Sequence, residues 1–234
     1  MSGQNTLLDL EEDLVPAAQE VLCLEPIWFQ PIVDTFAHRI LAYDCLIRHA
    51  DDCNAVEAAI MRSMIIHSAA GHAQHGLYFV NLVPSMIGDP EIDMRSTDKA
   101  IFDAGMLPGN LVFEALEPDL ARDPLRSRCL REYLRRKGFG FALSGAGVSA
   151  GVCSFQAVSD FTPDYIKLDR RLTRHISQQA CAPAIGKLVQ MAENSGARVI
   201  AEGVDRVRMV ENLWLLGVQF MQGHLFGDPS LHTA

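Results

Sequence analysis

The sequence predicts an α/β fold, a modified (β/α)8 barrel of the TIM type with an antiparallel first strand. Short apolar runs alternate with helical patterns along most of the 234 residues, which is typical of parallel βα units. About seven or eight such units follow one another without a second block of different composition, and this favours a single closed barrel. Only a short turn at residues 34–39 separates the first two runs, so these strands should form an antiparallel hairpin.

The expected strands are short runs rich in β-branched, aromatic and other apolar residues. They cover residues 27–33, 40–47, 77–82, 111–116, 139–143, 165–168, 199–201 and 220–225. A doubly wound open sheet is the alternative for the same order of elements. The sequence lacks the Gly-x-Gly-x-x-Gly opening that would favour such a sheet, so we prefer the barrel.

The expected helices lie between these strands and have recognisable ends. They cover residues 55–73, 124–137, 151–160, 182–195 and 207–216. Asp123 followed by Pro124 is typical of a helix start, and Gly138, Gly196 and Gly217 predict helix C-terminal stops. Residues 1–20 are expected to form an N-terminal lead-in or linker, and residues 21–234 the barrel domain.

Composition narrows the function classes. The formal net charge of −9 argues against a nucleic-acid polymer as partner, because such binding needs a basic face. No apolar run approaches the roughly 18–20 residues of a membrane span, so no membrane span is expected. Six cysteines without Cys-x-x-Cys pairing suggest reduced thiols, and the N-terminus is polar and acidic, unlike a signal peptide. Together these features predict a cytoplasmic protein.

Charged or amide side chains follow the expected strands at the point where each strand ends. They are Asn81, Glu114, Lys167, Asp169, Glu202 and Gln222. A buried charge is costly unless it is paired or bound, and in a barrel all these strand ends meet on one face. Lys167 and Asp169 are two residues apart, so they should point the same way. With Asp44, these oxygens and the lysine suit a divalent metal and a phosphate substrate; inter-strand ion pairs and loop caps are the alternative.

Seven segments, in the right order, resemble the EAL domain, the bacterial family that hydrolyses or senses cyclic di-GMP. They are residues 29–34 (FQPIVD), 42–48 (AYDCLIR), 80–84 (VNLVP), 111–117 (LVFEALE), 166–169 (IKLD), 200–205 (IAEGVD) and 222–229 (QGHLFGDP). The second segment stands in place of the family's Glu-Ala-Leu-Leu-Arg signature. The resemblance implies a modified barrel with an antiparallel first strand, in agreement with the predicted hairpin.

The resemblance also implies a two-metal site that this sequence has partly lost. Active members use two divalent metals, with ligands implied here at Asp44, Asn81, Glu114 and an Asp-Asp pair. Ser144 and Gly145 stand at the positions of that pair, and Asp44 is one methylene shorter than the family's Glu. Two metals about 3.5–4 Å apart need anionic bridges, which serine and glycine cannot supply. We therefore expect no catalytic residues and no bound metal, with Lys167 and Glu202 as remnants of a water-positioning lysine and a catalytic acid.

The nucleotide pocket implied by the resemblance is largely kept. Its expected residues are Gln30, Asp44, Leu46, Arg48, Asn81, Glu114, Asp169, Glu202, Gln222, Phe226 and Pro229. The preferred hypothesis is a catalytically inactive EAL-like domain that acts as a cyclic di-GMP receptor in bacterial signalling and needs no cofactor.

Two alternatives remain open. The first is a degenerate domain that no longer binds nucleotide and regulates through a protein partner. The second is an active cyclic di-GMP phosphodiesterase with a rearranged site for Mg or Mn, to which Asp160 or Asp164 would contribute. The resemblance also leaves room for a homodimer, to which the apolar helix expected at residues 182–195 could contribute.

Overall fold

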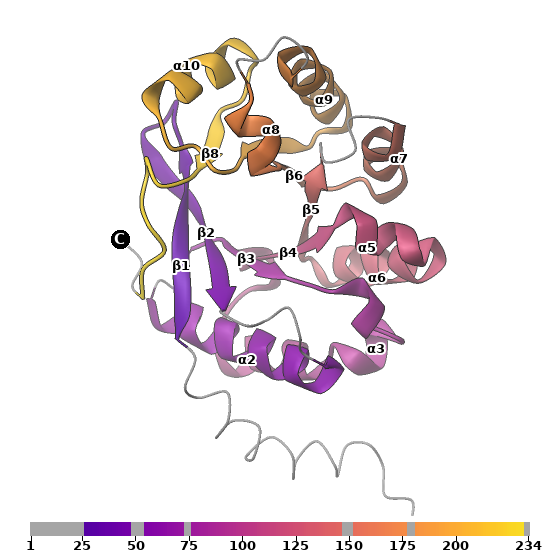
Figure 1. Ribbon diagram of the computed structural model, residues 1–234. Coiled ribbons are helices and arrows are strands. Elements are labelled where there is room, and N and C mark those ends of the chain that lie inside the picture. The colour runs from indigo at the N-terminus through magenta and orange to yellow at the C-terminus, as the bar shows by residue number, and fades with distance from the viewer. Residues whose placement is uncertain (1–25, 48–53, 73–75, 147–151, 177–180, 232–234) are drawn as a thin grey trace, which may run out of the picture.

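A computed structural model describes residues 26–47, 54–72, 76–146, 152–176 and 181–231. Its strands close into a barrel with the helices outside it (Figure 1). In chain order they are β1 (Ile27–Asp34), β2 (Arg39–Ile47), β3 (Tyr78–Asn81), β4 (Leu111–Leu116), β5 (Gly140–Ala146), β6 (Tyr165–Leu168), β7 (Arg198–Ala201) and β8 (Phe220–Gln222). Each strand pairs with the next, and β8 closes on β1.

Strand β1 is antiparallel to both of its neighbours, whereas β2 to β8 are parallel to one another. The predicted fold class is therefore confirmed. The hairpin forms because Asp34 organises the turn after β1: its Oδ1 accepts hydrogen bonds from the backbone N–H groups of Phe36 and Ala37. The carboxyl ends of β2 to β8 consequently meet on one face, the mouth of the barrel.

The helices surround the strands (Figure 1). They are α2 (Ala55–His72), α3 (Pro90–Asp93), α4 (Arg95–Asp103), α5 (Glu117–Arg122), α6 (Pro124–Lys137), α7 (Val152–Phe161), α8 (Arg170–Arg174), α9 (Cys181–Ser195) and α10 (Val207–Leu215), with 3-10 turns at Pro84–Met86 and Pro108–Asn110. The five predicted helices are present, with ends shifted by about one residue. The prediction missed α3, α5 and α8, which are too short to show a helical period clearly, and it also missed α4, which is as long as α10.

Helix ends follow the predicted chemistry. Asp123 accepts a hydrogen bond from the backbone N–H of Arg126 at the start of α6. The three predicted glycine stops have φ of +82° at Gly138, +78° at Gly196 and +83° at Gly217, a region that favours glycine. No helix within the described ranges is long and apolar enough to cross a bilayer.

Two layers of side chains fill the inside of the barrel. The apolar layer contains Ile32, Ala42, Phe79, Val112, Ala142 and Ile200, with Tyr165 and Phe220 packed against it. Side chains two residues apart on a strand share a side, so the next layer is read from the sequence by a step of two. That step toward the mouth gives Gln30, Asp44, Asn81, Glu114, Ser144, Lys167, Glu202 and Gln222. The barrel therefore carries a polar layer on an apolar floor.

Candidate functional site

Lys167 lies at the centre of the polar layer and is 1% exposed. Its Nζ atom is 2.9 Å from Asp44 Oδ2, 2.7 Å from Glu114 Oε2 and 2.9 Å from Glu202 Oε1. Below it, the ring of Phe79 lies 5.7 Å from the ammonium, close enough for a cation–π contact. The sequence predicted that Lys167 and Glu202 are remnants of a catalytic site. In the structure the lysine is the shared partner of three carboxylates, which come from β2, from β4 and from the residue that follows β7.

The electrostatics of Lys167 favour its charged form. Burial alone would lower the pKa of this ammonium group, but attraction by Asp44, Glu114 and Glu202 outweighs burial and holds the pKa well above 10.5. The lysine is therefore a permanent cation at physiological pH. It acts as a fixed positive charge where the three carboxylates converge.

Glu114 has the most perturbed carboxyl group of the layer. Burial raises its pKa from 4.5 to about 7, Lys167 opposes the rise, and the charges of Asp44 and Glu202 add to it. A group with this pKa changes its protonation near neutrality. The polar layer consequently gains or loses one negative charge within the physiological pH range.

An amide network ties the first strand to this cluster. The Nε2 atom of Gln222 lies 2.9 Å from Gln30 Oε1 and 2.9 Å from Asp44 Oδ2. Because Nε2 faces two acceptors, the amide must point its nitrogen toward them. Its Oε1 is buried and has no hydrogen-bond partner among the described residues. That oxygen is an acceptor still available to a ligand donor or a water molecule.

The end of β5 supplies no acid to the layer. Between Leu143 and Ala146 the pairing with β6 shifts register, with one more residue on β5 than on β6. Ser144 is 5% exposed, and Gly145 has φ of +74°, as in a bulge that uses a left-handed glycine. The polar layer therefore has a hydroxyl on this strand, as the sequence predicts.

The donor set does not fit a pair of divalent metals. Asp44 and Glu114 both direct an oxygen at the Lys167 ammonium, so a cation already lies between them. Ser144 and Gly145 offer no anionic bridge, which two neighbouring metal ions need. Within the described ranges, no group of three or more His, Cys, Asp or Glu side chains has the geometry of a metal site.

Asn81 and Asp169 form no hydrogen bond or ion pair with the Lys167 cluster in the described structure. Asn81 is exposed at the end of β3, in register with Glu114. Asp169 lies beyond the last residue of β6, caps α8 and accepts two hydrogen bonds from the Arg171 side chain, which lower the pKa of Asp169. The strand ends at Leu168, so the two-residue alternation expected to align Lys167 with Asp169 stops before Asp169.

The remaining predicted residues divide into two groups. Leu46, Phe226 and Pro229 are half-buried, and the segment that contains the latter two runs beside β1, where Phe29 pairs with Ser230 (Figure 1). Arg48 lies outside the described residues.

The two aspartates suggested for a rearranged metal site lie elsewhere. Asp164 precedes the first residue of β6, at the barrel end opposite the mouth, and its carboxylate accepts the backbone N–H of Phe141. Asp160 lies on α7 and forms an ion pair with Arg128. Neither side chain joins the Lys167 cluster.

Curated relatives resemble this chain over part of their length. The cyclic di-GMP phosphodiesterase RocR of Pseudomonas aeruginosa is 30% identical over 155 residues, covering 64% of this chain and 38% of RocR. PdeB of Shewanella oneidensis, also a cyclic di-GMP phosphodiesterase, is 27% identical over 153 residues, covering 64% of this chain and 17% of PdeB. The matched region is thus less than two fifths of either relative. The Escherichia coli antirepressor BluF, regulated by blue light and temperature, is 23% identical over 87% of this chain and 54% of BluF.

Solved structures share the fold. Klebsiella pneumoniae BlrP1, in complex with calcium and cyclic di-GMP, superposes with a TM-score of 0.80 at 21% identity, covering 88% of this chain and 55% of that chain. A standalone EAL protein of Vibrio cholerae O395, bound to cyclic di-GMP, gives a TM-score of 0.75 at 24% identity, covering 88% of this chain and 92% of that chain. At these identities, the likeness establishes the barrel fold.

The family model of the EAL domain matches residues 55–229. The match begins after the β1–β2 hairpin, so the segment around Asp44 that replaces the family signature precedes it. The matched residues include Glu114 on β4, Lys167 on β6 and Glu202, which follows β7. The chain belongs to the EAL domain family and is related to cyclic di-GMP phosphodiesterases.

Proposed function

We propose that this chain is a catalytically inactive EAL domain that binds cyclic di-GMP as a receptor and needs no metal ion to do so. The observation that carries the proposal is the position of the Lys167 ammonium, which neutralises part of the charge of Asp44, Glu114 and Glu202 from within the protein. A metal ion bound by Asp44 and Glu114 would lie close to this ammonium, and the two positive charges would repel each other. Cyclic di-GMP could still bind without a metal ion, because the lysine already supplies a fixed positive charge to the site.

Loss of catalysis follows from the same arrangement. Hydrolysis by two metals needs a metal-bound water that is strongly acidified and aligned with the phosphodiester. Lys167 donates hydrogen bonds to Asp44 and Glu114 and forms an ion pair with Glu202, and the end of β5 contributes only Ser144 and Gly145. Without a bound metal, the cluster has no described group that acidifies a water molecule as a divalent ion does.

Nucleotide recognition is supported by the groups that remain at the mouth. Gln222 Oε1 is buried without a partner in the described structure and can accept a hydrogen bond from a ligand N–H. Gln30 is held beside it by the Gln222 amide and by its own bond to the Gly227 carbonyl, 3.3 Å away. An amide pair fixed before binding loses little entropy on binding, which favours affinity.

The direct test is equilibrium dialysis of the purified chain against labelled cyclic di-GMP, with chromatography of the nucleotide recovered from both chambers. The proposal predicts retention of nucleotide in EDTA and recovery of the intact cyclic form in excess Mg²⁺ or Mn²⁺. The Gln222→Ala variant should lose retention, and Lys99→Ala, a change at an exposed ion pair on α4, should keep it. A linear product would contradict inactivity, and no retention in any condition would contradict the receptor.

The second candidate is a domain that regulates through a protein partner and binds no nucleotide. It is favoured by the excess of carboxylates around Lys167, which repel a doubly anionic ligand, and by the similarity to BluF, which is described as an antirepressor. A folded wild-type chain that retains no cyclic di-GMP in the dialysis, but co-purifies with a defined protein, would support this candidate.

A further inference from the structure

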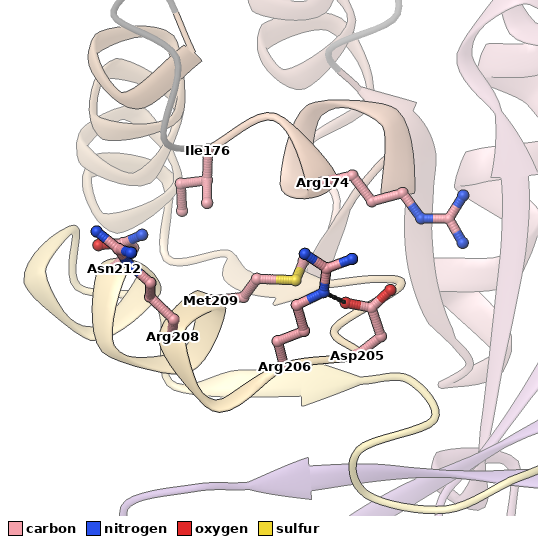
Figure 2. A pocket seen from close by; sticks show the side chains of 7 residues that line it. All are labelled: Arg174, Ile176, Asp205, Arg206, Arg208, Met209 and Asn212. Atoms are coloured by element: carbon pink, nitrogen blue, oxygen red, sulfur yellow. Dashed lines mark ion pairs between the residues drawn. The ribbon is translucent and has the colours of Figure 1, made fainter.

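A second hollow lies outside the barrel, between α8 and the first turn of α10 (Figure 2). Its volume is about 540 Å³, within the range of small-molecule sites. Three arginines line it: Arg174 from α8, and Arg206 and Arg208 at the start of α10. Ile176 and Met209 form buried apolar parts of its wall.

The charge of this hollow is strongly positive for so acidic a chain. The lining includes one acid, Asp205, whose Oδ1 lies 3.5 Å from Arg206 Nε. No carboxylate of the described residues lies within ion-pair distance of Arg174 or Arg208. Several arginines elsewhere in the described structure are paired with acids, namely Arg122, Arg126, Arg128, Arg131, Arg135, Arg136 and Arg171. Arg39, Arg95, Arg170 and Arg198 are exposed and form no ion pair there, but they do not line the hollow. Positive charge is therefore left uncompensated here, although the whole chain carries −9.

The start of α10 makes the excess positive charge more costly. Arg206 occupies the N-cap position without a side-chain cap, and Arg208 lies in the first turn. The N-terminal end of a helix carries a partial positive charge, so two cations there are unfavourable unless an anion neutralises them. An anion in the hollow would offset the repulsion and accept hydrogen bonds from the first-turn N–H groups.

Figure 2 shows the three arginines spread along the hollow. Arg206 lies across the middle of the hollow beside Asp205 and Met209, and Arg208 lies at one end. Arg174 stands at the other end with its guanidinium turned outward, but exposed side chains change rotamer within nanoseconds. The apolar wall limits screening of charges placed against it, which strengthens attraction for an anion.

We propose that this hollow is a binding site for a phosphate monoester or a diphosphate, separate from the barrel mouth. Guanidinium groups form paired, parallel hydrogen bonds with phosphate oxygens, and a phosphate offers enough acceptors for Arg206, Arg208 and the helix N–H groups at once. The same chemistry is presented by a free phosphorylated metabolite and by a phosphorylated side chain of a protein partner. The proposal does not depend on whether the barrel binds cyclic di-GMP.

The test is isothermal titration of the full chain with sodium pyrophosphate in EDTA, at constant ionic strength. Wild-type protein should bind, and Arg206→Gln combined with Arg208→Gln should weaken binding by about tenfold or more. The matched control is Arg122→Gln combined with Arg126→Gln, two exposed and acid-paired arginines, which should leave binding unchanged. Removal of two cations from the start of α10 should not lower the melting temperature, so lost binding would not reflect unfolding.

Two further arms separate the sources and the sites. The site would be assigned to a protein partner if a phosphoserine peptide bound more tightly than pyrophosphate and the unphosphorylated peptide did not bind. It would be assigned to a free metabolite if pyrophosphate bound more tightly than the peptide. Gln222→Ala should leave pyrophosphate binding intact, and the arginine variant should leave cyclic di-GMP binding intact. The proposal would be overturned if the arginine variant still bound pyrophosphate, or if no phosphate probe bound to the wild-type chain. It would also be overturned if chloride abolished pyrophosphate binding at equal ionic strength.

Discussion

The ammonium of Lys167 lies 2.7 Å from Glu114 Oε2, and both side chains are buried in the mouth of the barrel. This contact joins β4 to β6, and the same ammonium also reaches Asp44 on β2 and Glu202 beyond β7. The lysine thus connects four parts of the chain through one charge. Stability and ligand binding should both depend on it.

Replacement of Lys167 by methionine should destabilise the barrel by about 3–5 kcal/mol, because it leaves buried carboxylates without their counter-charge. Urea denaturation followed by circular dichroism measures the change. Lys99→Met is the matched control: its ion pair with Asp103 is exposed, so its cost should be about 0–1 kcal/mol. Equal losses in the two variants would mean that the Lys167 cluster contributes no more than a surface pair.

Glu114 should make stability fall as the pH rises from 4.5 to about 7. Its folded-state pKa is raised, so between these values the folded chain binds more protons than the unfolded chain. Its contribution is fully present below 4.5 and is lost by about 7. The lowered pKa values of Asp34 and Asp169 act below 3.8, outside this window.

Urea titrations at several pH values measure this dependence, and the Glu114→Gln variant supplies the comparison. The slope between 4.5 and about 7 should be smaller in the variant, since glutamine does not titrate. An unchanged slope would show that another group titrates there.

Cyclic di-GMP should bind more tightly as the pH falls from about 8 to about 6, because protonation of Glu114 removes a negative charge facing a doubly anionic ligand. Glu114→Gln should bind with nearly constant affinity over the same range. Titration calorimetry in matched buffers measures both. Affinity that rises with pH in the wild-type chain would contradict the proposed role of this carboxyl group.

Two glycine-to-alanine changes should have opposite effects. A Cβ at Gly223, whose φ is +155°, would lie 2.2 Å from the carbonyl oxygen of Val204, so the backbone at the end of β8 must move. We expect a loss of roughly 2–5 kcal/mol. A Cβ at Gly71 in α2 meets nothing within 4 Å, so Gly71→Ala should gain about 0.5–1 kcal/mol. Thermal unfolding measures both, and a stable Gly223→Ala variant would contradict the close approach of β8 to Val204.

Restoration of the lost acids should restore metal binding only in combination. The variant with Ser144→Asp, Gly145→Asp and Asp44→Glu should gain a Mn²⁺-dependent rise in melting temperature and slow hydrolysis of cyclic di-GMP. Single changes should show neither, because the ligands of a metal pair act as a unit. Aspartate at Gly145, with φ of +74°, should cost about 1–2 kcal/mol in the absence of metal. A triple variant insensitive to Mn²⁺ would show that these positions do not face a common metal site.

The barrel could be predicted from the sequence because strand periodicity and turn chemistry are local signals. Because the strand ends of a barrel meet on one face, the sequence also predicted that Glu114, Lys167, Glu202 and Gln222 lie together. The structure brings them together with Asp44. Asp169 was harder to place, because the period ends with β6 and the side chain turns to cap the next helix.

Other features depend on contacts between distant segments. The closed barrel is needed to see that the Lys167 ammonium contacts three carboxylates. It is also needed to see that Gln222 donates two hydrogen bonds from Nε2, while its Oε1 has no partner in the described structure. The hollow beside α10 was missed because Arg174 and Arg208 are separated in the sequence and neither belongs to a motif of the resemblance.

The most direct test of the proposed function is isothermal titration of the wild-type chain with cyclic di-GMP, first in EDTA and then in excess Mg²⁺. The structure of the Lys167 cluster predicts binding in EDTA with a dissociation constant that Mg²⁺ leaves unchanged. Binding that requires Mg²⁺, or no binding in either buffer, would contradict a metal-independent cyclic di-GMP receptor.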